Sequence, residues 1–142
     1  MKLTDAGDFL SVTPSELPPF HLARPRDVEG VISAMASAPG RVTLHAGGTD
    51  LFARFRAGLR PDSLIALGGV ASLRQTRADD EQVVLGAGLT HRAALSDPAV
   101  AAIPGLPRAW AQIATGPANH VGTLGGNLMA RHTHYELSNL MS

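Results

Sequence analysis

Two short motifs, each with a pair of adjacent glycines, constrain this chain more than any other feature. The first comprises Ala46, Gly47, Gly48, Thr49 and Asp50. The second lies further along the chain and comprises Gly122, Thr123, Leu124, Gly125, Gly126 and Asn127. Glycine has no Cβ atom, so a Gly-Gly pair lets the backbone adopt positive φ angles and approach a ligand closely. Both motifs therefore indicate sites of close backbone approach.

The chemistry of the first motif favours an anionic ligand. Successive amides in such a turn can form a concave anion site, and a helix predicted at 51–56 would add free N–H groups. Thr49 and Asp50 suit the cap of that helix. Because its carboxylate would repel a phosphate, we expect Asp50 to cap the helix or to bind a ribose hydroxyl. A ligand-free tight turn explains one such motif, whereas two favour a shared diphosphate.

Composition excludes several classes of protein. The chain has 142 residues, 44% of them apolar and 17% charged, with a formal net charge of zero. This suits one compact domain and argues against a basic nucleic-acid-binding face. The absence of cysteine excludes disulfides and thiolate metal sites within the chain. Residues 1–8 carry no apolar signal region and no long apolar run exists, so we expect a cytoplasmic protein without membrane insertion.

Strand and helix signals alternate in the first half of the chain. We interpret residues 1–19 as an irregular arm and residues 20–75 as an α/β lobe with a small parallel sheet. Its strands are expected at 20–23, 42–44 and 64–67. Its helices are expected at 28–38, after the cap residue Asp27, and at 51–56 before Gly58.

The second half has a mixed pattern, and we interpret residues 76–142 as a partial second lobe. Acidic residues 79–81 separate the two arms of a predicted hairpin. Helices are expected at 91–96, 98–102 and 106–114, followed by a loop to residue 120. Residues 86–91 fail as a dinucleotide fingerprint because His91 stands where the third glycine belongs. The predicted fold class is α+β.

The ordered set of motifs resembles the FAD-binding medium subunit of the molybdenum hydroxylases, the family of xanthine dehydrogenase and carbon monoxide dehydrogenase. The resemblance rests on the two glycine motifs, on Phe20 with Arg24-Pro25, and on the segments 64–67, 85–90 and 113–114. It implies an FAD-binding type-2 (PCMH-like) fold, truncated to its N-terminal half, with FAD between two lobes.

The resemblance also implies roles for particular residues. The first lobe would hold the FAD diphosphate through Ala46, Gly47, Gly48, Thr49 and Asp50. The second lobe would hold it through Gly122, Thr123, Gly125, Gly126 and Asn127. The flavin would lie near Gly86, Ala87 and Thr90. No residue of this chain would act as an acid, a base or a nucleophile.

The implied partners are an iron–sulfur subunit and a molybdenum subunit, on which the substrate is oxidised. FAD would pass the electrons to NAD, a quinone or another acceptor. Two departures from the family pattern are visible: residues 118–120 lack the arginine of a frequent Val-Arg-Asn, and residues 131–136 lack a small-residue, Pro and Asp pattern. Because the family continues well beyond residue 142, we expect a fragment, or a split subunit whose other half comes from another chain.

Other interpretations stay open. A flavin-free lobe could serve as an interaction module in the same complex. His132, His134 and Glu136 alternate and could bind a metal, although solvated polar residues fit better. Trp110 is expected in the core, and Arg54 is expected on the solvated surface.

Overall fold

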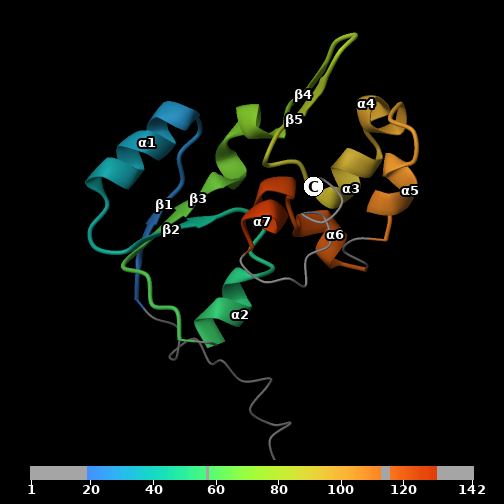
Figure 1. Cartoon of the computed structure of the whole chain (residues 1–142). Helices are drawn as coiled ribbons and strands as arrows, with labels where there is room; N and C mark the ends of the chain where they lie inside the picture. Colours follow the sequence, from blue (N-terminus) through green and yellow to red (C-terminus); the bar gives the residue numbers. More distant parts are fainter. Residues whose placement is uncertain (1–18, 57, 113–115, 131–142) are drawn as a thin grey trace, which may run out of the picture.

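Three short parallel strands form the centre of the first lobe (Figure 1). The computed structural model describes residues 19–56, 58–112 and 116–130. The strand order is β1 (His21–Ala23), β3 (Ser63–Ala66), β2 (Val42–His45). The register pairs Leu22 and Thr43 with Leu64 of the central strand. An apolar segment such as β3 is typical of a strand with neighbours on both sides.

Two helices accompany this sheet. Helix α1 (Val28–Ser37) begins at Asp27, whose side chain accepts a hydrogen bond of 2.7 Å from the Gly30 amide. Helix α2 (Leu51–Arg56) is followed by Gly58 at a φ of 96°. Leu51 and Phe55 of α2 pack against Leu64 and form the core of this lobe. Helix α1 buries none of its residues, so α2 supplies most of the apolar packing.

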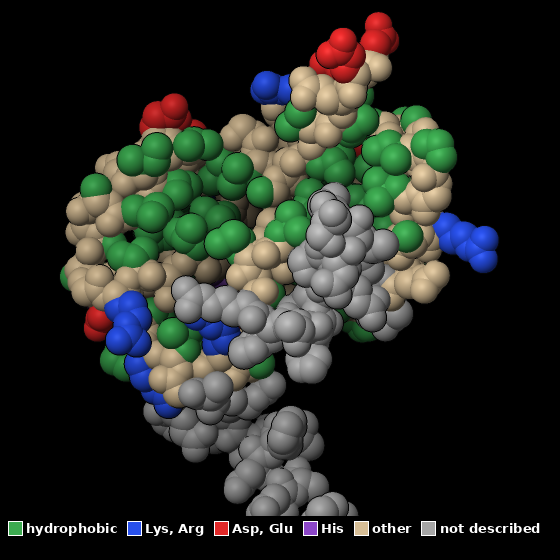
Figure 2. Space-filling view, viewed as in Figure 1, with side chains coloured by type: hydrophobic (Ala, Val, Ile, Leu, Met, Phe, Trp, Pro, Cys, Tyr) green, Lys and Arg blue, Asp and Glu red, His purple; other side chains and the backbone are tan. Residues whose placement is uncertain are grey.

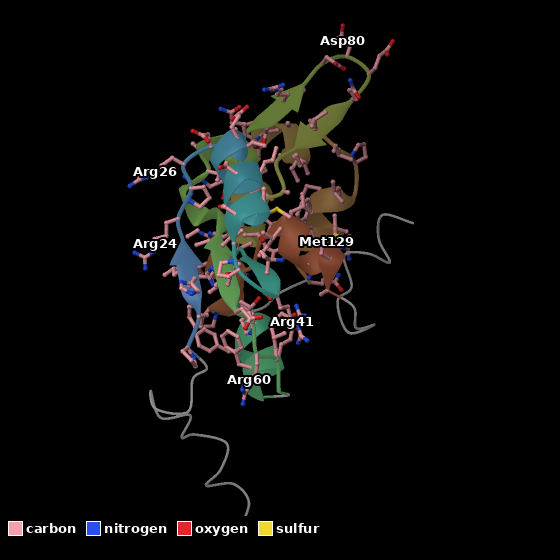
Figure 3. All side chains as sticks on the ribbon, turned by 90° about the vertical axis from the view of Figure 1, so that its left-hand side faces the viewer. Arg24, Arg26, Arg41, Arg60, Asp80 and Met129 are labelled. Carbon is pink, nitrogen blue, oxygen red and sulfur yellow. The ribbon has the colours of Figure 1, made fainter. Side chains whose placement is uncertain are left out.

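A projecting hairpin follows the sheet (Figures 1 and 2). After the 3₁₀ turns η2 (Leu67–Gly69) and η3 (Ala71–Arg74), strands β4 (Thr76–Ala78) and β5 (Val83–Leu85) pair antiparallel. Asp79 fixes the turn because its Oδ1 accepts from the amides of Glu81 and Gln82. These two bonds lower the pKa of the Asp79 carboxyl. The acidic tip, where Asp80 lies, is turned away from both lobes (Figure 3).

Five short helices build the second lobe. They are α3 (His91–Leu95), α4 (Pro98–Ala101), α5 (Leu106–Trp110), α6 (Ala118–Val121) and α7 (Leu124–Met129). Their shared core contains Ala94, Val100, Trp110 and Leu124. Trp110 is fully buried, as predicted. No described helix is long and apolar enough to cross a membrane.

The fold class is confirmed: an α/β lobe with a small parallel sheet lies beside a mixed lobe. The boundaries at residues 20–75 and 76–142 stay predictions, and the arm predicted at residues 1–19 falls almost entirely outside the described residues. One local prediction was wrong. The loop expected up to residue 120 includes the first residues of α6. The second glycine motif runs into α7.

The central strand gives a first test. Ile65 of β3 is fully buried, whereas Ile32 of α1 is 62% exposed. We expect Ile65→Ala to lower the free energy of unfolding by about 2–5 kcal/mol, because it removes buried methyl groups and leaves a cavity. Ile32→Ala, the matched control, should change it by less than about 0.5 kcal/mol. Denaturant unfolding measures both, and equal losses would contradict the placement of β3.

Candidate functional site

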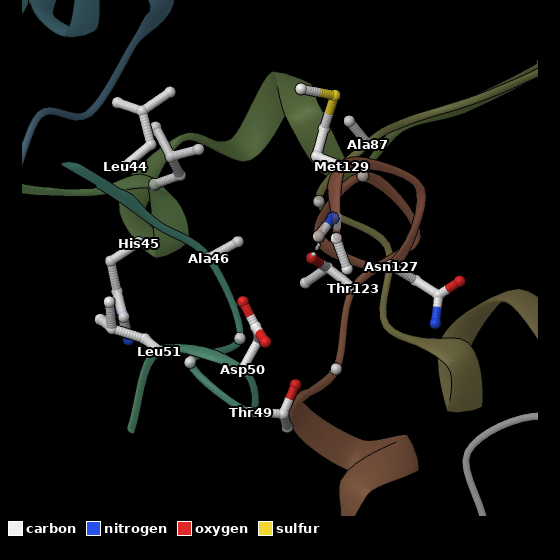
Figure 4. Close-up of a pocket in the computed structure, with 18 of the residues that line it drawn as sticks. Leu44, His45, Ala46, Thr49, Asp50, Leu51, Ala87, Thr123, Asn127 and Met129 are labelled. Atoms are coloured by element: carbon white, nitrogen blue, oxygen red, sulfur yellow. Dashed lines mark hydrogen bonds between the residues drawn. The ribbon is translucent and has the colours of Figure 1, made fainter. Parts of the chain in front are cut away.

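A cleft of about 1030 Å³ separates the two glycine motifs. Residues from β2, the following turn and α2 line it from the first lobe, and residues around α7 line it from the second. Figure 4 shows Thr49 and Asp50 on one side and Thr123 on the other. The volume lies at the upper end of the range for small-molecule sites. Both motifs therefore face one cavity, as the sequence predicts.

Most of the predicted site residues line this cleft. They are Ala46, Gly47, Gly48, Thr49, Asp50, Ala87, Gly122, Thr123, Gly125, Gly126 and Asn127. Gly86 and Thr90 do not line it. A Cβ atom on Gly86 would collide with the carbonyl oxygen of Leu73, so this glycine lets the hairpin pack on η3. Thr90 caps α3 by accepting from the Ala93 amide at 3.2 Å.

The first glycine pair is required by the fold itself. A Cβ atom on Gly47 would collide with the carbonyl oxygen of Val121, at the end of α6. The backbones of the two lobes therefore touch at this point. Gly48 has a φ of 80°, and a Cβ atom there would lie 2.7 Å from Nε2 of His45. Any side chain at position 48 would be strained as well as crowded.

The turn of the first motif presents unused hydrogen-bond donors. Within the described residues, the amides of Gly47, Gly48 and Thr49 donate to no protein acceptor. The Gly48 carbonyl accepts from the Leu51 amide at 3.1 Å, which fixes the turn ahead of α2. A buried or ligand-facing amide needs a partner, so this turn is suited to an acceptor-rich group such as a phosphate.

The second motif differs because most of its amides are already paired, although the Thr123 amide donates to no protein acceptor within the described residues. Gly122 donates to the Ala118 carbonyl at 2.7 Å and Gly125 to the Ala87 carbonyl at 2.8 Å. Gly126 donates to the Thr123 side chain at 3.2 Å, which caps α7. Of the two motifs, only the first presents consecutive amides without a protein acceptor, and the expectation that amides on both sides bind one diphosphate stays a prediction. Besides its side chains, the second motif has one amide without a protein acceptor, that of Thr123.

Arg54 is a lining residue that the sequence interpretation missed. Among the described lining residues it is the only Arg or Lys. Its Nε lies 3.9 Å from Oδ2 of Asp50, one helical turn earlier on α2. The spacing of four residues places both groups on one helix face, which is the signal that could have assigned Arg54 to the cleft. The side chain is half exposed, so water screens its charge in part.

Apolar side chains line another part of the cleft. Leu44, Leu67, Leu73 and Met129 contribute to it. Figure 4 shows Leu44 and Met129 facing the gap from opposite sides, apart from the Thr49 and Asp50 region. Met129 is 81% exposed. The cleft thus combines a polar region with an apolar one, as an amphipathic ligand requires.

His91 is a buried titratable group on the second-lobe wall. It is 2% exposed and lines the cleft. The Nε1–H of Trp110 donates to its Nδ1 at 3.0 Å. Burial lowers the pKa of His91 below 6.5, so the ring is neutral at physiological pH. Sequence reasoning used His91 only to exclude a dinucleotide fingerprint.

A metal site finds no support among the residues that the structure describes, where no group of three or more His, Cys, Asp or Glu side chains could hold an ion. The candidate ligands His132, His134 and Glu136 lie outside those residues.

The fold and the cleft define an FAD-binding domain. Residues 18–141 match the family described as the FAD binding domain in molybdopterin dehydrogenase. The chain belongs to this family of the molybdenum hydroxylases, and its fold is the FAD-binding type expected from the resemblance. No curated protein sequence matches the chain significantly.

Solved structures agree with this assignment. One similar chain belongs to carbon monoxide dehydrogenase from Hydrogenophaga pseudoflava, with a TM-score of 0.72 and 29% identity over 79% of this chain. Quinoline 2-oxidoreductase from Pseudomonas putida 86 gives a TM-score of 0.72, 30% identity and the same coverage. Carbon monoxide dehydrogenase from Oligotropha carboxidovorans gives 0.72 and 26% over 78%. The matched region spans 40% of each of these chains.

The pKa of His91 gives a second test. In the unfolded chain His91 takes up a proton near pH 6.5, whereas burial opposes protonation in the folded chain. The free energy of unfolding should therefore fall as the pH drops from about 7.5 to 5.5. His91→Gln cannot titrate, so its decline should be shallower. Denaturant unfolding at each pH measures this, and identical pH dependence in both proteins would contradict it.

Proposed function

We propose that this chain is the FAD-binding, electron-transfer part of a molybdenum hydroxylase. The observation that carries the proposal is the cleft whose first-lobe turn presents three unpaired amides beside Arg54, in a chain of an FAD-binding family. FAD supplies the redox chemistry when bound, and the protein supplies placement and electrostatics. The enzyme class is therefore an oxidoreductase subunit without an acid or base of its own.

The residues present fit this cofactor. The unpaired amides of Gly47, Gly48 and Thr49 supply donors for the diphosphate, and Arg54, which lines the cleft, supplies a positive charge. Asp50 points into the gap (Figure 4), where its carboxylate suits a hydroxyl group and not a phosphate. Small residues leave space in the cleft for the ligand, namely Ala46, Ala87, Gly125 and Gly126. The apolar region of the cleft is suited to a planar ring.

We further propose that electrons arrive from an iron–sulfur subunit and originate at a molybdenum subunit. The family match and a similar chain from a Cu,Mo-CO dehydrogenase support this. The final acceptor would be NAD, a quinone or another oxidant. Because the chain spans 40% of the matched chains, a further segment or chain would complete the cofactor site.

An interaction module without flavin is the second candidate. The second motif favours it, since all its amides but that of Thr123 are paired within the protein and are not available to a diphosphate. The two functions differ in one simple property. A flavin-binding protein is yellow after reconstitution with FAD, whereas the module would stay colourless while still binding the iron–sulfur or molybdenum subunits.

Substitution of Gly48 tests the proposed function. We expect the reconstituted wild-type chain to retain FAD through gel filtration and Gly48→Val to lose it, because a side chain there disrupts the turn and its amides. Gly68→Val is the matched control, since a Cβ atom on Gly68 meets nothing within 4 Å. Visible absorbance measures bound flavin, and circular dichroism checks the helices. Full flavin content in Gly48→Val would contradict the proposed role of the turn.

Arg54 gives an independent electrostatic test. Arg54→Met should weaken FAD binding about tenfold, the usual cost of losing a charge-assisted hydrogen bond. It should also flatten the salt dependence of the dissociation constant. Arg26, which does not line the cleft, provides the control Arg26→Met. Isothermal titration calorimetry at two salt concentrations measures both effects. Equal dissociation constants and equal salt dependence in the two variants would show that Arg54 does not contribute to FAD binding.

A further inference from the structure

Strand β1 is an edge strand, with no neighbour on its outer side among the described residues. The His21 amide donates to the Asp62 carbonyl at 2.9 Å, on the side of β3. Because hydrogen-bonding groups alternate along a strand, the N–H and C=O of Leu22 point to the free edge. The opposite edge of the sheet, β2, borders the cleft. The outer side of β1 is therefore where the described sheet can accept a further strand.

A groove and an exposed apolar side chain accompany this free edge. The groove has a volume of about 260 Å³ and lies between β1 and the C-terminal end of α1. Small and apolar residues contribute to its lining, among them Leu22, Ala23, Ala34 and Ile65. Leu22 is 46% exposed. A strand added to β1 would cover Leu22 and place its own side chains at the groove.

The charges beside β1 select the kind of strand that binds. Arg24 and Arg26 follow β1 closely, and residues 20–26 contain no acidic residue. Both arginines are exposed, and within the described residues neither forms an ion pair. Figure 3 shows both side chains projecting from the same side of the first lobe. Pairing of β1 with a second β1 would gather four arginines along one edge, so repulsion opposes it and an acidic strand is favoured.

The chain itself supplies an acidic pair of strands, the hairpin of β4 and β5. Residues 76–85 carry three acidic side chains and one arginine. Asp80 and Glu81 are exposed, and neither has an ion-pair partner in the part of the chain that the structure describes. Val84 of β5 is 53% exposed. The hairpin projects from the rest of the molecule (Figures 1 and 2), so it can reach a second copy without a change in fold.

We propose that the acidic hairpin of one copy binds along the free edge of β1 in a second copy. Strand β5 runs away from the hairpin tip, whereas β1 runs toward Arg24 and Arg26. Antiparallel alignment of the two strands therefore places Asp80 and Glu81 beside these arginines. None of these residues lines the cleft, so the inference does not depend on flavin binding.

The proposed contact is head-to-tail, because the hairpin and the β1 edge are different surfaces. Each bound copy still offers a hairpin or an edge, so association continues beyond a dimer unless a ring closes. Strands of three residues and exposed ion pairs make a weak contact. We expect a monomer at low concentration, larger species at high concentration, and weaker association at high salt.

Charge reversal tests the contact. Asp80→Lys with Glu81→Lys reverses the hairpin, and Arg24→Glu with Arg26→Glu reverses the edge. Each reversed protein should associate about tenfold more weakly than the wild type. An equimolar mixture of the two should associate again, because each protein then offers the charge that the other requires. Sedimentation velocity over a concentration series, at low and at high salt, measures these effects.

A matched control reverses two arginines elsewhere. Arg92→Glu with Arg108→Glu changes the net charge as much as the edge variant does, but at exposed positions of α3 and α5. This control should associate like the wild type, and circular dichroism identifies any variant that fails to fold.

Three results would overturn the inference. The first is a wild-type chain that stays monomeric at every concentration, which would leave the edge to a different chain. The second is an equal loss of association in the control. The third is a mixture of the two reversed proteins that associates no better than either protein alone.

Discussion

The backbone contact between Gly47 and the Val121 carbonyl sets the distance between the two lobes. No side chain fits at position 47, so the lobes approach more closely than any other residue would allow. This contact places the amides that follow it next to the second lobe. The site therefore depends on a missing Cβ atom at the lobe interface as much as on any group that touches a ligand.

Local signals were sufficient for much of the fold. Asp27 caps α1 as predicted because an N-cap needs only the adjacent amides. Gly58 ends the α2 region with a positive φ for a similarly local reason. The apolar run at β3 indicated a buried parallel strand, since its pattern reflects neighbours on both sides. The turn of the hairpin followed from the acidic segment 79–81.

Other features could not be predicted from the sequence because they depend on contacts between segments that are far apart in it. Gly125 and Gly126 are poor helix formers, yet α7 forms there because Ala87 and Leu89 accept hydrogen bonds from its first turn. Those carbonyls lie far away in sequence, so the glycine pattern alone indicated a second open turn. The same limitation hid His91, whose position at the cleft depends on how α3 packs. The sequence thus indicated which residues line the cleft better than it indicated which of their backbone or side-chain groups are available to a ligand.

The hydrogen bond from Trp110 to His91 has a practical consequence. Trp110 is the only tryptophan of the chain, and its indole is joined directly to a side chain of the cleft wall. Intrinsic emission therefore has a single origin, one bond removed from the cavity. Any ligand, proton or subunit that disturbs the imidazole also changes the excited state of this indole. The fluorescence of Trp110 therefore reports on events in the cleft without an added label.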